Sequence, residues 1–261
     1  MADPASTIAI IPAFNETATI VDITRRAIPH VARVIVIDDG STDGTPDALV
    51  GLPVEVLRNS RNLGKSASLV LGFARAIEIG VEFVVTLDGD GQHLPEDIPR
   101  LLAAAARCPG EIIIGARLRY RERMPRLRRF GNAMADFWIS WAAGYPIRDT
   151  QSGMRLYPLT ALACACSGRS GESRFVLESE VLIDAAREGC RATRIEIDTI
   201  YGSTSRGSYY RAMGDTVPIV CMVARKLLQR GLNPVGLLRS LGMLPAYRAA
   251  PGERRLAAGP D

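Results

Sequence analysis

Short apolar segments rich in β-branched residues alternate with segments of helical periodicity along the first part of the chain. The apolar segments span residues 6–14, 31–39, 54–59, 82–90 and 111–117, and the helical segments span 17–28, 65–80 and 94–108. Strands that are connected through helices run parallel within one sheet. The alternation therefore predicts an α/β fold with a mainly parallel central sheet flanked by helices.

Polar residues follow each of these predicted strands. They are Asn15 and Glu16, Asp38 and Asp39, Asn59 and Asn62, Asp88 and Asp90, and Arg117. The carboxyl ends of parallel strands meet at one edge of a sheet, and ligands bind at that edge. We therefore expect these side chains to line one site, at an edge that we call the rim.

The regular alternation of predicted strands and helices ends after residue 116. We expect helices over 130–144, 175–189 and 215–231, a loop over 149–158, a strand over 192–201 and a disordered tail over 248–261. Pro218 is expected in the first turn of the last helix, where proline is tolerated.

Composition and charge exclude several classes of function. The net charge of the 261 residues is only +4, so bulk charge predicts no nucleic-acid partner. The five cysteines form no C-x-x-C pair, and His30 and His93 are not placed to complete a zinc site, so we expect reduced, buried thiols in a cytoplasmic protein. No signal peptide is visible, and no stretch approaches the roughly 20 apolar residues of a membrane span.

The segment VVTLDGDGQH (84–93) ends a predicted buried strand with two carboxylates. If the extended geometry persists, Asp88 and Asp90 point the same way, and Gln92 adds a carbonyl oxygen two residues later. Such oxygen ligands suit Mg²⁺ or Mn²⁺ bound to a diphosphate, and Gly89 lets phosphates approach the backbone. The alternative is an acidic turn, but the position at the rim favours a metal.

Two further motifs indicate a nucleotide at the same rim. In DDGSTDGT, Asp39 can hydrogen-bond a base or ribose, although a tight turn with a helix cap is the alternative. In NLGKSA, Lys65 stands at a helix start, where its cation and the free N–H groups favour phosphate. The chain lacks the P-loop motif and the G-x-G-x-x-G motif of a dinucleotide fold.

Five segments, in this order and spacing, resemble an inverting family 2 glycosyltransferase of the GT-A fold: IPAFNE, VIDDGSTDGT, NLGKSASLVLGF, LDGDGQH and DTQSGMRLYP. The resemblance covers roughly residues 6–220 and is strongest to the polyprenyl-phosphate branch, which includes dolichyl-phosphate mannosyl- and glucosyltransferases. It implies a UDP- or GDP-linked sugar donor and a divalent metal. It also implies one domain over 1–230, with a nucleotide-binding half (1–116) and an acceptor-binding half (117–230), followed by a partly disordered extension over 231–261.

The resemblance also assigns roles by position. The matching positions for the base and ribose are Pro12, Phe14, Glu16 and Asp39, and those for the metal and diphosphate are Asp88, Asp90 and Gln92. Lys65 and Gly89 are further expected donor contacts, and Arg117 matches an arginine that meets phosphate. Asp90, Arg117 and Glu180 are the candidate catalytic residues.

The sequence departs from the family pattern in its acidic residues. Many relatives that glycosylate hydroxyl groups carry two adjacent acidic residues as the general base, whereas VLESEV here separates Glu178 from Glu180 by Ser179. Ser66 also stands where the family often has glycine, and Phe14 replaces a common tyrosine. A hydroxyl acceptor needs a base, but a lipid phosphate is already an anion near pH 7.

The missing acidic pair and a run of arginines favour transfer of a hexose to a polyprenyl phosphate. Seven arginines lie between Arg117 and Arg129, and Arg117, Arg126, Arg128 and Arg129 are the expected acceptor-phosphate contacts, although a solvated loop is the alternative. One rival function is transfer to a hydroxyl acceptor with Glu180 or Asp149 as base. Another is a non-catalytic nucleotide-sugar binding module.

The segment 217–230 contains VPIVCMVA followed by Arg225, Lys226 and Arg230. We expect an amphipathic helix that lies in the bilayer interface, at the cytoplasmic face of the membrane. The alternative is that this helix packs as ordinary core or against another subunit. The sequence leaves the oligomeric state open.

Overall fold

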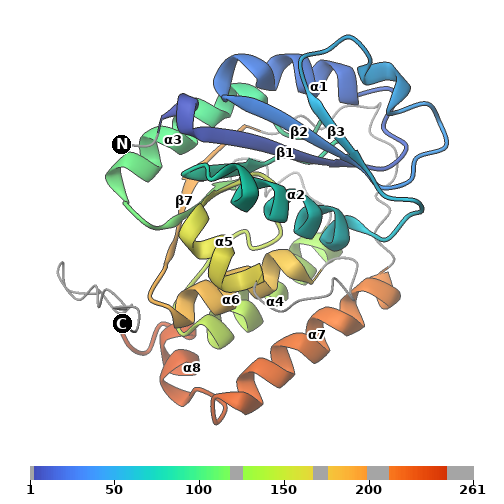
Figure 1. The fold of residues 1–261 in the computed structure, drawn as a ribbon. Coiled ribbons are helices and arrows are strands. Elements are labelled where there is room, and N and C mark those ends of the chain that lie inside the picture. Colours follow the sequence, from blue (N-terminus) through green and yellow to red (C-terminus); the bar gives the residue numbers. More distant parts are fainter. Residues whose placement is uncertain (1–2, 118–125, 167–175, 199–211, 246–261) are drawn as a thin grey trace, which may run out of the picture.

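A computed structural model describes residues 3–117, 126–166, 176–198 and 212–245. One seven-stranded sheet crosses the molecule in the order β3-β2-β1-β4-β6-β5-β7 (Figure 1). Its strands are β1 (Thr7–Ala13), β2 (Arg33–Asp38), β3 (Glu55–Arg58), β4 (Phe83–Thr86), β5 (Ile112–Ala116), β6 (Arg155–Pro158) and β7 (Ala192–Glu196). The sheet draws its strands from both halves of the chain.

Six of these seven strands run parallel. β1 pairs in parallel with β2 and β4, and β5 with β7, whereas β6 lies antiparallel between β4 and β5. The expected mainly parallel sheet is therefore confirmed. Because β1 to β5 all point the same way, their polar carboxyl-terminal residues do share one edge of the sheet.

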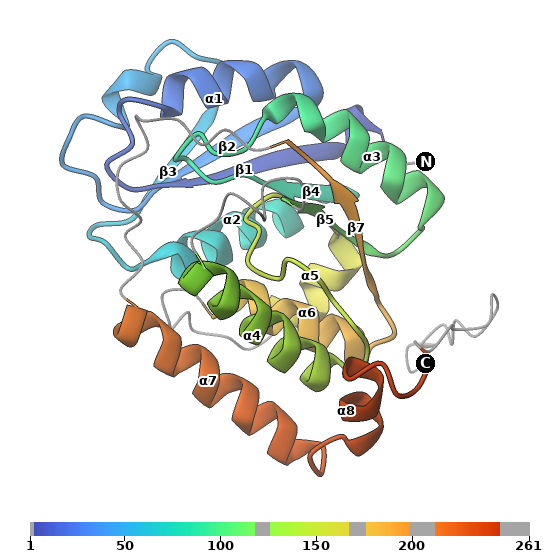
Figure 2. The same ribbon diagram turned by 180° about the vertical axis from the view of Figure 1, so that it is seen from behind.

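Helices cover both faces of the sheet (Figures 1 and 2). On one face lie α1 (Ile20–Ala27) and α3 (Ile98–Arg107). On the other lie α2 (Lys65–Ile79), α5 (Leu159–Cys166) and α6 (Leu177–Arg187), with α4 (Arg126–Ala143), α7 (Ala212–Gln229) and α8 (Pro234–Ser240) beyond them. Short 3₁₀ helices span Pro4–Ser6, Ile28–His30, Asp47–Leu49 and Pro95–Asp97.

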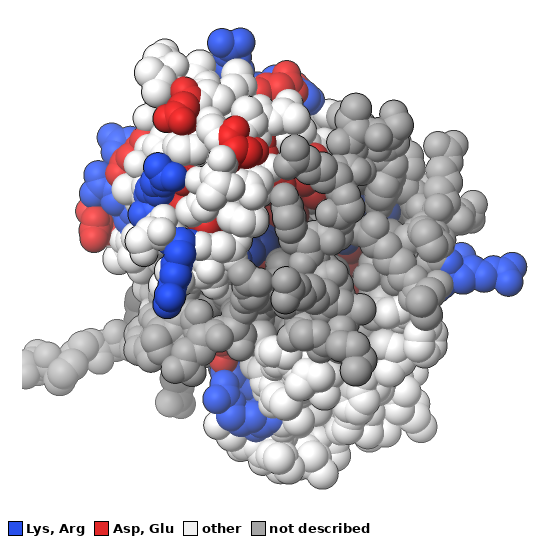
Figure 3. Space-filling view, turned by 90° about the vertical axis from the view of Figure 1, so that its right-hand side faces the viewer, with Lys and Arg blue, Asp and Glu red and all other residues white. Residues whose placement is uncertain are grey.

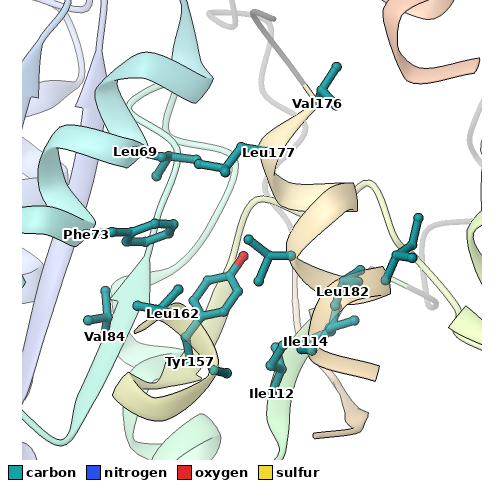
Figure 4. Packing of buried hydrophobic residues seen from close by; sticks show 14 of the residues in the cluster. Leu69, Phe73, Val84, Ile112, Ile114, Tyr157, Leu162, Val176, Leu177 and Leu182 are labelled. Carbon is teal, nitrogen blue, oxygen red and sulfur yellow. The ribbon is translucent and has the colours of Figure 1, made fainter. Parts of the chain in front are cut away.

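The larger core lies between the sheet and helices α2, α5 and α6 (Figure 4). Phe73 of α2 and Tyr157 of β6 meet edge to face, with ring centroids 5.5 Å apart. Leu162 and Leu182 pack beside them from α5 and α6. Each such side chain stabilises the fold by roughly 1.5–3 kcal/mol through burial. This core fixes α2 and α6, the two helices whose first turns face the rim.

Glycine ends α2 as the sequence predicts. Gly80 adopts the left-handed conformation with φ 75° and donates its N–H to the carbonyls of Ala76 and Ile77. A side chain would be strained at that φ, so glycine is the favoured C-terminal cap.

Several expectations from the sequence are wrong. The segment 149–158 is not simply a loop, because Arg155–Pro158 form β6, and α5 follows it directly. Helix α4 begins at Arg126, four residues before the expected start, so Arg126 to Arg129 form a first helical turn and not a loop. Pro218 lies inside α7, beyond its first turn. The exposed Cys221 contradicts the expectation that all thiols are buried.

The first part of the expected extension, 231–261, contains helix α8, which packs on α4. Trp141 of α4 donates its indole N–H to the carbonyl oxygen of Leu232 at 2.8 Å. The Asn233 side chain caps α8 by accepting from the Gly236 N–H at 3.2 Å. Residues 246–261, to which most of the predicted disorder applies, lie outside the described part of the chain. Within the described ranges, no helix has both the length and the apolar character to cross a bilayer.

Candidate functional site

The two carboxylates of the DGD motif lie in a turn and not on a strand. β4 ends at Thr86, and the chain bends through residues 89–91, where Gly91 has φ 76°. The Asp90 carboxylate accepts the backbone N–H of Gln92 at 3.0 Å. The expected strand alternation is therefore wrong, yet the turn still keeps Asp88 and Asp90 close enough for their charges to interact.

A lysine ammonium lies against Asp88. Lys65, the first residue of α2, places its Nζ 2.5 Å from Asp88 Oδ1 and 3.0 Å from Glu178 Oε2. Burial alone would raise the pKa of Asp88, but the charge of Lys65 outweighs it and lowers that pKa to about 2. Asp88 is thus a carboxylate at any physiological pH.

Asp90 is in the opposite electrostatic situation. Burial, and then the negative charge of Asp88, raise the pKa of Asp90 to about 6. Lys65 is shared between Asp88 and Glu178, so three acidic groups gather around one ammonium. This surplus of negative charge makes the turn attractive to a cation.

The structure brings Glu178, and not Glu180, to this cluster. Glu178 opens α6 beside Lys65, and its Oε1 is buried without a hydrogen-bond partner among the described residues. The Glu180 carboxylate lies instead 3.1 Å from Lys226 Nζ of α7. Residues two positions apart on a helix point to nearly opposite sides, which separates the two glutamates.

A tight loop before β6 supports the cluster from the other side. A Cβ on Gly153 would lie only 2.0 Å from Asp88 Oδ2, so only glycine fits there. The fully buried Arg155 donates to the carbonyl oxygens of Thr150 at 2.6 Å and Glu178 at 2.7 Å. Arg155 therefore connects this loop to the first turn of α6.

Arg117 is held by a carboxylate partner. Its guanidinium donates to both Asp149 oxygens, at 3.2 and 2.9 Å, and its backbone N–H donates to one of them at 2.7 Å. Asp136 of α4 in turn accepts the backbone N–H groups of Asp149 and Thr150. Burial raises the pKa of Asp149, but the bonds from Arg117 lower it below its usual value. Asp149 is therefore a weak candidate for a general base.

Asp39 organises the loop that leads into α2. Its two oxygens accept the backbone N–H of Leu63 at 2.9 Å, the backbone N–H of Gly64 at 2.7 Å and the side chain of Asn59 at 2.8 Å. These bonds set the position of Lys65 at the helix start. A contact of Asp39 with a base or ribose stays a prediction.

The other expected donor residues flank β1. Pro12, Phe14 and Glu16 are partly exposed. A Cβ on Gly89 would lie 3.1 Å from the Pro12 carbonyl oxygen and 3.4 Å from Glu16 Cγ, so the DGD turn packs directly on the end of β1. The Thr19 hydroxyl donates to the Gly89 carbonyl oxygen at 2.6 Å and fixes this contact.

The arginine run is described only in part. Arg126 and Arg129 are exposed in the first turn of α4, which begins on the rim side of the sheet (Figure 2). The side chain of Arg128 lies outside the described part of the chain, as do Arg119, Arg121 and Arg123. Binding of an acceptor phosphate by these arginines stays a prediction.

The donor set at the turn fits part of a metal site. In the described residues, no three histidine, cysteine, aspartate or glutamate side chains converge to enclose an ion. Asp88 and Asp90 offer two half-buried carboxylates with excess negative charge, and Gln92 stands beside them. Mg²⁺ commonly binds to one or two carboxylates and takes its other ligands from water and substrate phosphates. The residues fit that arrangement.

Three contributors were not expected from the sequence: His93, Glu178 and Gly153. His93 is buried with Nε2 3.9 Å from Asp88 Oδ2, and burial lowers the pKa of His93 to about 4, so it is neutral near pH 7. Its proximity to the DGD motif was the available signal. For Glu178 the signal was helical spacing, because Glu180 and Asp184 share a face that Glu178 does not. For Gly153, nothing in the neighbouring sequence distinguished a glycine required by a close contact from a glycine in an ordinary turn.

The chain is similar to a family of known proteins and to several individual members. Residues 8–177 match the family model described as Glycosyl transferase family 2. The UDP-N-acetylglucosamine–dolichyl-phosphate N-acetylglucosaminyltransferase of Methanococcus voltae is 28% identical over 247 residues, which cover 87% of this chain and 96% of that protein. The undecaprenyl-phosphate mannosyltransferase of Micrococcus luteus is 29% identical over 204 residues, which cover 72% of this chain and 81% of that protein.

A solved structure shares the fold. Glucosyl-3-phosphoglycerate synthase from Mycobacterium tuberculosis, in complex with Mn²⁺, uridine diphosphate and glucosyl-3-phosphoglycerate, matches with a TM-score of 0.61 and 18% identity. The match covers 88% of this chain and 82% of that one. The expected GT-A fold is confirmed.

Proposed function

The chain belongs to glycosyl transferase family 2, and we propose that it transfers a hexose from a UDP- or GDP-linked donor to a polyprenyl phosphate. The acceptor phosphate oxygen attacks the anomeric carbon from the side opposite the leaving group. The bond from that carbon to the nucleoside diphosphate breaks, and the diphosphate leaves with the electron pair. One attack of this kind inverts the anomeric configuration.

The surplus of negative charge at the DGD turn is the observation that carries this proposal. A divalent metal at Asp88, Asp90 and Gln92 would bind the donor diphosphate and stabilise the charge that develops on it as it leaves. Lys65 adds a second cation at the start of α2, beside the free N–H groups of the first turn. Gly89, Pro12, Phe14, Glu16 and Asp39 are the proposed contacts of the nucleotide.

The choice of a phosphate acceptor follows from the acidic residues near the rim. A hydroxyl acceptor would need a free carboxylate as base. Asp149 is bound by Arg117, Glu180 by Lys226, and Glu178 by Lys65 through one of its two oxygens, and Asp90 is assigned to the metal. A lipid phosphate needs no base, and Arg126, Arg128 and Arg129 are the proposed cations that attract it. The names of the relatives from Methanococcus voltae and Micrococcus luteus, which include dolichyl and undecaprenyl phosphate, support the same class of acceptor.

Turnover measured with purified components tests the proposal. The full chain is incubated with Mn²⁺, UDP- or GDP-linked hexoses and a polyprenyl phosphate, and the glycolipid is detected by mass spectrometry. Lipid product that forms only with metal supports the proposal. Product that forms only with hydroxyl acceptors would favour the rival transferase. Donor binding without any turnover would favour a binding module.

Charge reversal at Arg129 tests the acceptor site separately. Arg129→Glu should raise the KM for the lipid phosphate by about tenfold and leave nucleotide affinity unchanged, because the exposed side chain lies in α4 and not on the donor loops. Equal losses of donor and acceptor affinity would instead assign the first turn of α4 to the donor site.

A further inference from the structure

Helix α7 has an inner face that the protein buries. Met222, Val223 and Leu227 belong to the larger core, behind α4 and α6. Lys226, on the same face, places its Nζ 2.6 Å from Asp184 and 3.1 Å from Glu180. The Lys226 ammonium therefore pairs with carboxylates inside the protein and is not available to a lipid headgroup, contrary to the expectation for residues 217–230.

The opposite side of α7 carries an apolar stripe. Val217, Val220, Cys221, Ala224 and Leu228 recur at the three- and four-residue spacing of one helical face, and all are exposed. Leu228 is 70% exposed. A stripe of this kind on a helix whose other side is packed has no structural role within the described chain.

Helix α8 and the residues around it extend this stripe. Leu232, Val235, Leu238, Leu241, Met243 and Leu244 are all exposed, and Met243 reaches 68%. We call these side chains, together with Val217, Val220 and Leu228, the outer face. So many exposed apolar side chains on two consecutive helices indicate an interaction site.

The charge of the same segment is of one sign. From Thr216 to Pro245 the sequence contains Arg225, Lys226, Arg230 and Arg239 and no acidic residue. The Arg225 guanidinium lies 3.6 Å from Glu180, and its side chain is still 64% exposed. In Figure 3 the lower part of the molecule, the level at which α7 lies in Figure 1, is mainly white with a patch of blue.

The outer face also has a defined relation to the rim. In Figure 1 the strands end on the right, and α7 begins on that side before running to α8 on the left. Phe130 is exposed and follows Arg129 near the start of α4, the helix that begins on the rim side (Figure 2). A flat partner covering the outer face would therefore reach the side on which the site opens.

We propose that the outer face of α7 and α8 docks on the surface of an anionic lipid bilayer. Apolar side chains would enter the interface while Arg225 meets the headgroups. A second copy of the chain is a poorer occupant, because a two-fold contact would place the same basic segments against each other without acidic partners. This inference rests on the proposed function in one respect: an enzyme with a lipid acceptor must reach the membrane that holds the lipid.

Vesicle sedimentation with the full chain tests the inference. We expect the protein to sediment with vesicles of phosphatidylcholine and phosphatidylglycerol at low salt, and to be released at high salt or with phosphatidylcholine alone. The double variant Val220→Glu, Leu241→Glu should partition at least about tenfold less, because anions replace two apolar side chains that would enter the bilayer. Both positions are exposed, so the unfolding temperature should not change.

A matched control keeps the test specific. Val50 is 83% exposed and lies in the loop before β3, away from the outer face, so Val50→Glu should bind vesicles like the unaltered protein. Equal binding of all three proteins, or no vesicle binding at all, would overturn the inference. The inference would also be overturned if light scattering showed that the unaltered protein is a dimer and that the double variant is a monomer.

A short, water-soluble polyprenyl phosphate separates this inference from the proposed function. The double variant should keep its turnover of the short acceptor and lose at least about tenfold with a long acceptor embedded in vesicles. Vesicle binding without turnover of either acceptor would reject the proposed function and leave the docking surface supported. Equal loss with both acceptors would contradict the docking role.

Discussion

Two lysines of this protein each bridge two carboxylates, on different sides of helix α6. Lys65 joins Asp88 to Glu178 at the rim, and Lys226 joins Glu180 to Asp184 beneath α7. Both ammonium groups are largely shielded, with side chains 20% and 7% exposed. The local chemistry is therefore the same, and the two clusters differ in what surrounds them.

The surroundings differ in their balance of charge. Around Lys226, Arg225 lies 3.6 Å from Glu180 and Arg187 lies 3.6 Å from Asp184, so three cations surround two acids. Around Lys65, the additional neighbour is Asp90, and Arg117 is engaged by Asp149. The cluster whose acids all have cations stabilises the packing of α7, whereas the cluster with an excess of acids attracts a further cation. An ion-pair cluster thus indicates a cation site when its acidic groups outnumber its cations.

Removing Lys226 should have the largest effect. Lys226→Met leaves the half-buried Glu180 and Asp184 with only the more exposed Arg225 and Arg187 as cations, so the free energy of unfolding should fall by about 3 kcal/mol. Urea titration measures this, and nucleotide affinity of the folded variant should stay unchanged. A loss under about 1 kcal/mol would mean that water already solvates the pair.

Removing Asp90 should mainly affect turnover. Asp90→Asn should lower kcat by roughly 10²–10³-fold and weaken metal and donor binding together. The fold should be as stable as before or more so, since the empty site repels itself. Calorimetry with and without chelator provides the measurement, and donor affinity that is equal in both conditions would count against the metal.

Removing Lys65 should distinguish the behaviour of the rim cluster from that of the Lys226 cluster most clearly. Lys65→Met should cost about 2 kcal/mol of stability, less than Lys226→Met because the rim groups retain some solvent. Mn²⁺ at ten times its Kd should recover about 1.4 kcal/mol of that loss. At the same Mn²⁺ concentration, Lys226→Met should gain only as much stability as the unaltered protein gains, because its rim is intact, whereas Lys65→Met should gain more. Equal gains in both variants would remove the distinction drawn above.

The pH dependence of stability should show the smallest effect. The pKa of Asp90 is raised to about 6, so its contribution to stability is present at low pH and is lost as pH rises from about 4 to 6. The pKa of His93 is lowered to about 4, so its contribution is lost as pH falls from about 6.5 to 4. The two slopes oppose each other in the metal-free protein.

Variants at Asp90 and at His93 should each reveal one of these two pH dependences of stability. Asp90→Asn should make stability rise with pH over this window, and His93→Gln should make it fall, each by about 1 kcal/mol relative to the unaltered protein. Thermal unfolding at four pH values between 4 and 7 measures the difference. Parallel curves for all three proteins would show that neither group has the environment described here.

The parallel part of the fold was predictable because its signals are local. β1, β2 and β5 are continuous apolar runs, and Gly80 marks the end of α2. β6 was not predictable, because RLYP is short and follows Ser152 and Gly153. It becomes a strand only where β4 and β5 offer it hydrogen-bonding partners on both sides.

The candidate site likewise contains residues that local sequence could predict and residues that it could not. Asp88, Asp90 and Lys65 were expected at the rim because each stands next to a predicted strand end or helix start. The choice between Glu178 and Glu180 depends on how α6 is rotated about its axis. Long-range packing sets that rotation: Arg155 holds the Glu178 carbonyl, and Lys226 draws Glu180 toward α7.

The antiparallel strand β6 also constrains the order in which the chain can be completed. β4 and β5 follow each other in sequence but never pair, since each must wait for β6 to lie between them. When residue 116 emerges from a ribosome, β1 to β4 can already form a four-stranded sheet, while β5 has neither of its neighbours. Synthesis of the 42 residues from 116 to 158 takes roughly 2–8 s. We therefore expect a partly assembled nascent protein with the free side of β4 exposed during that interval, and chaperone contact should concentrate there.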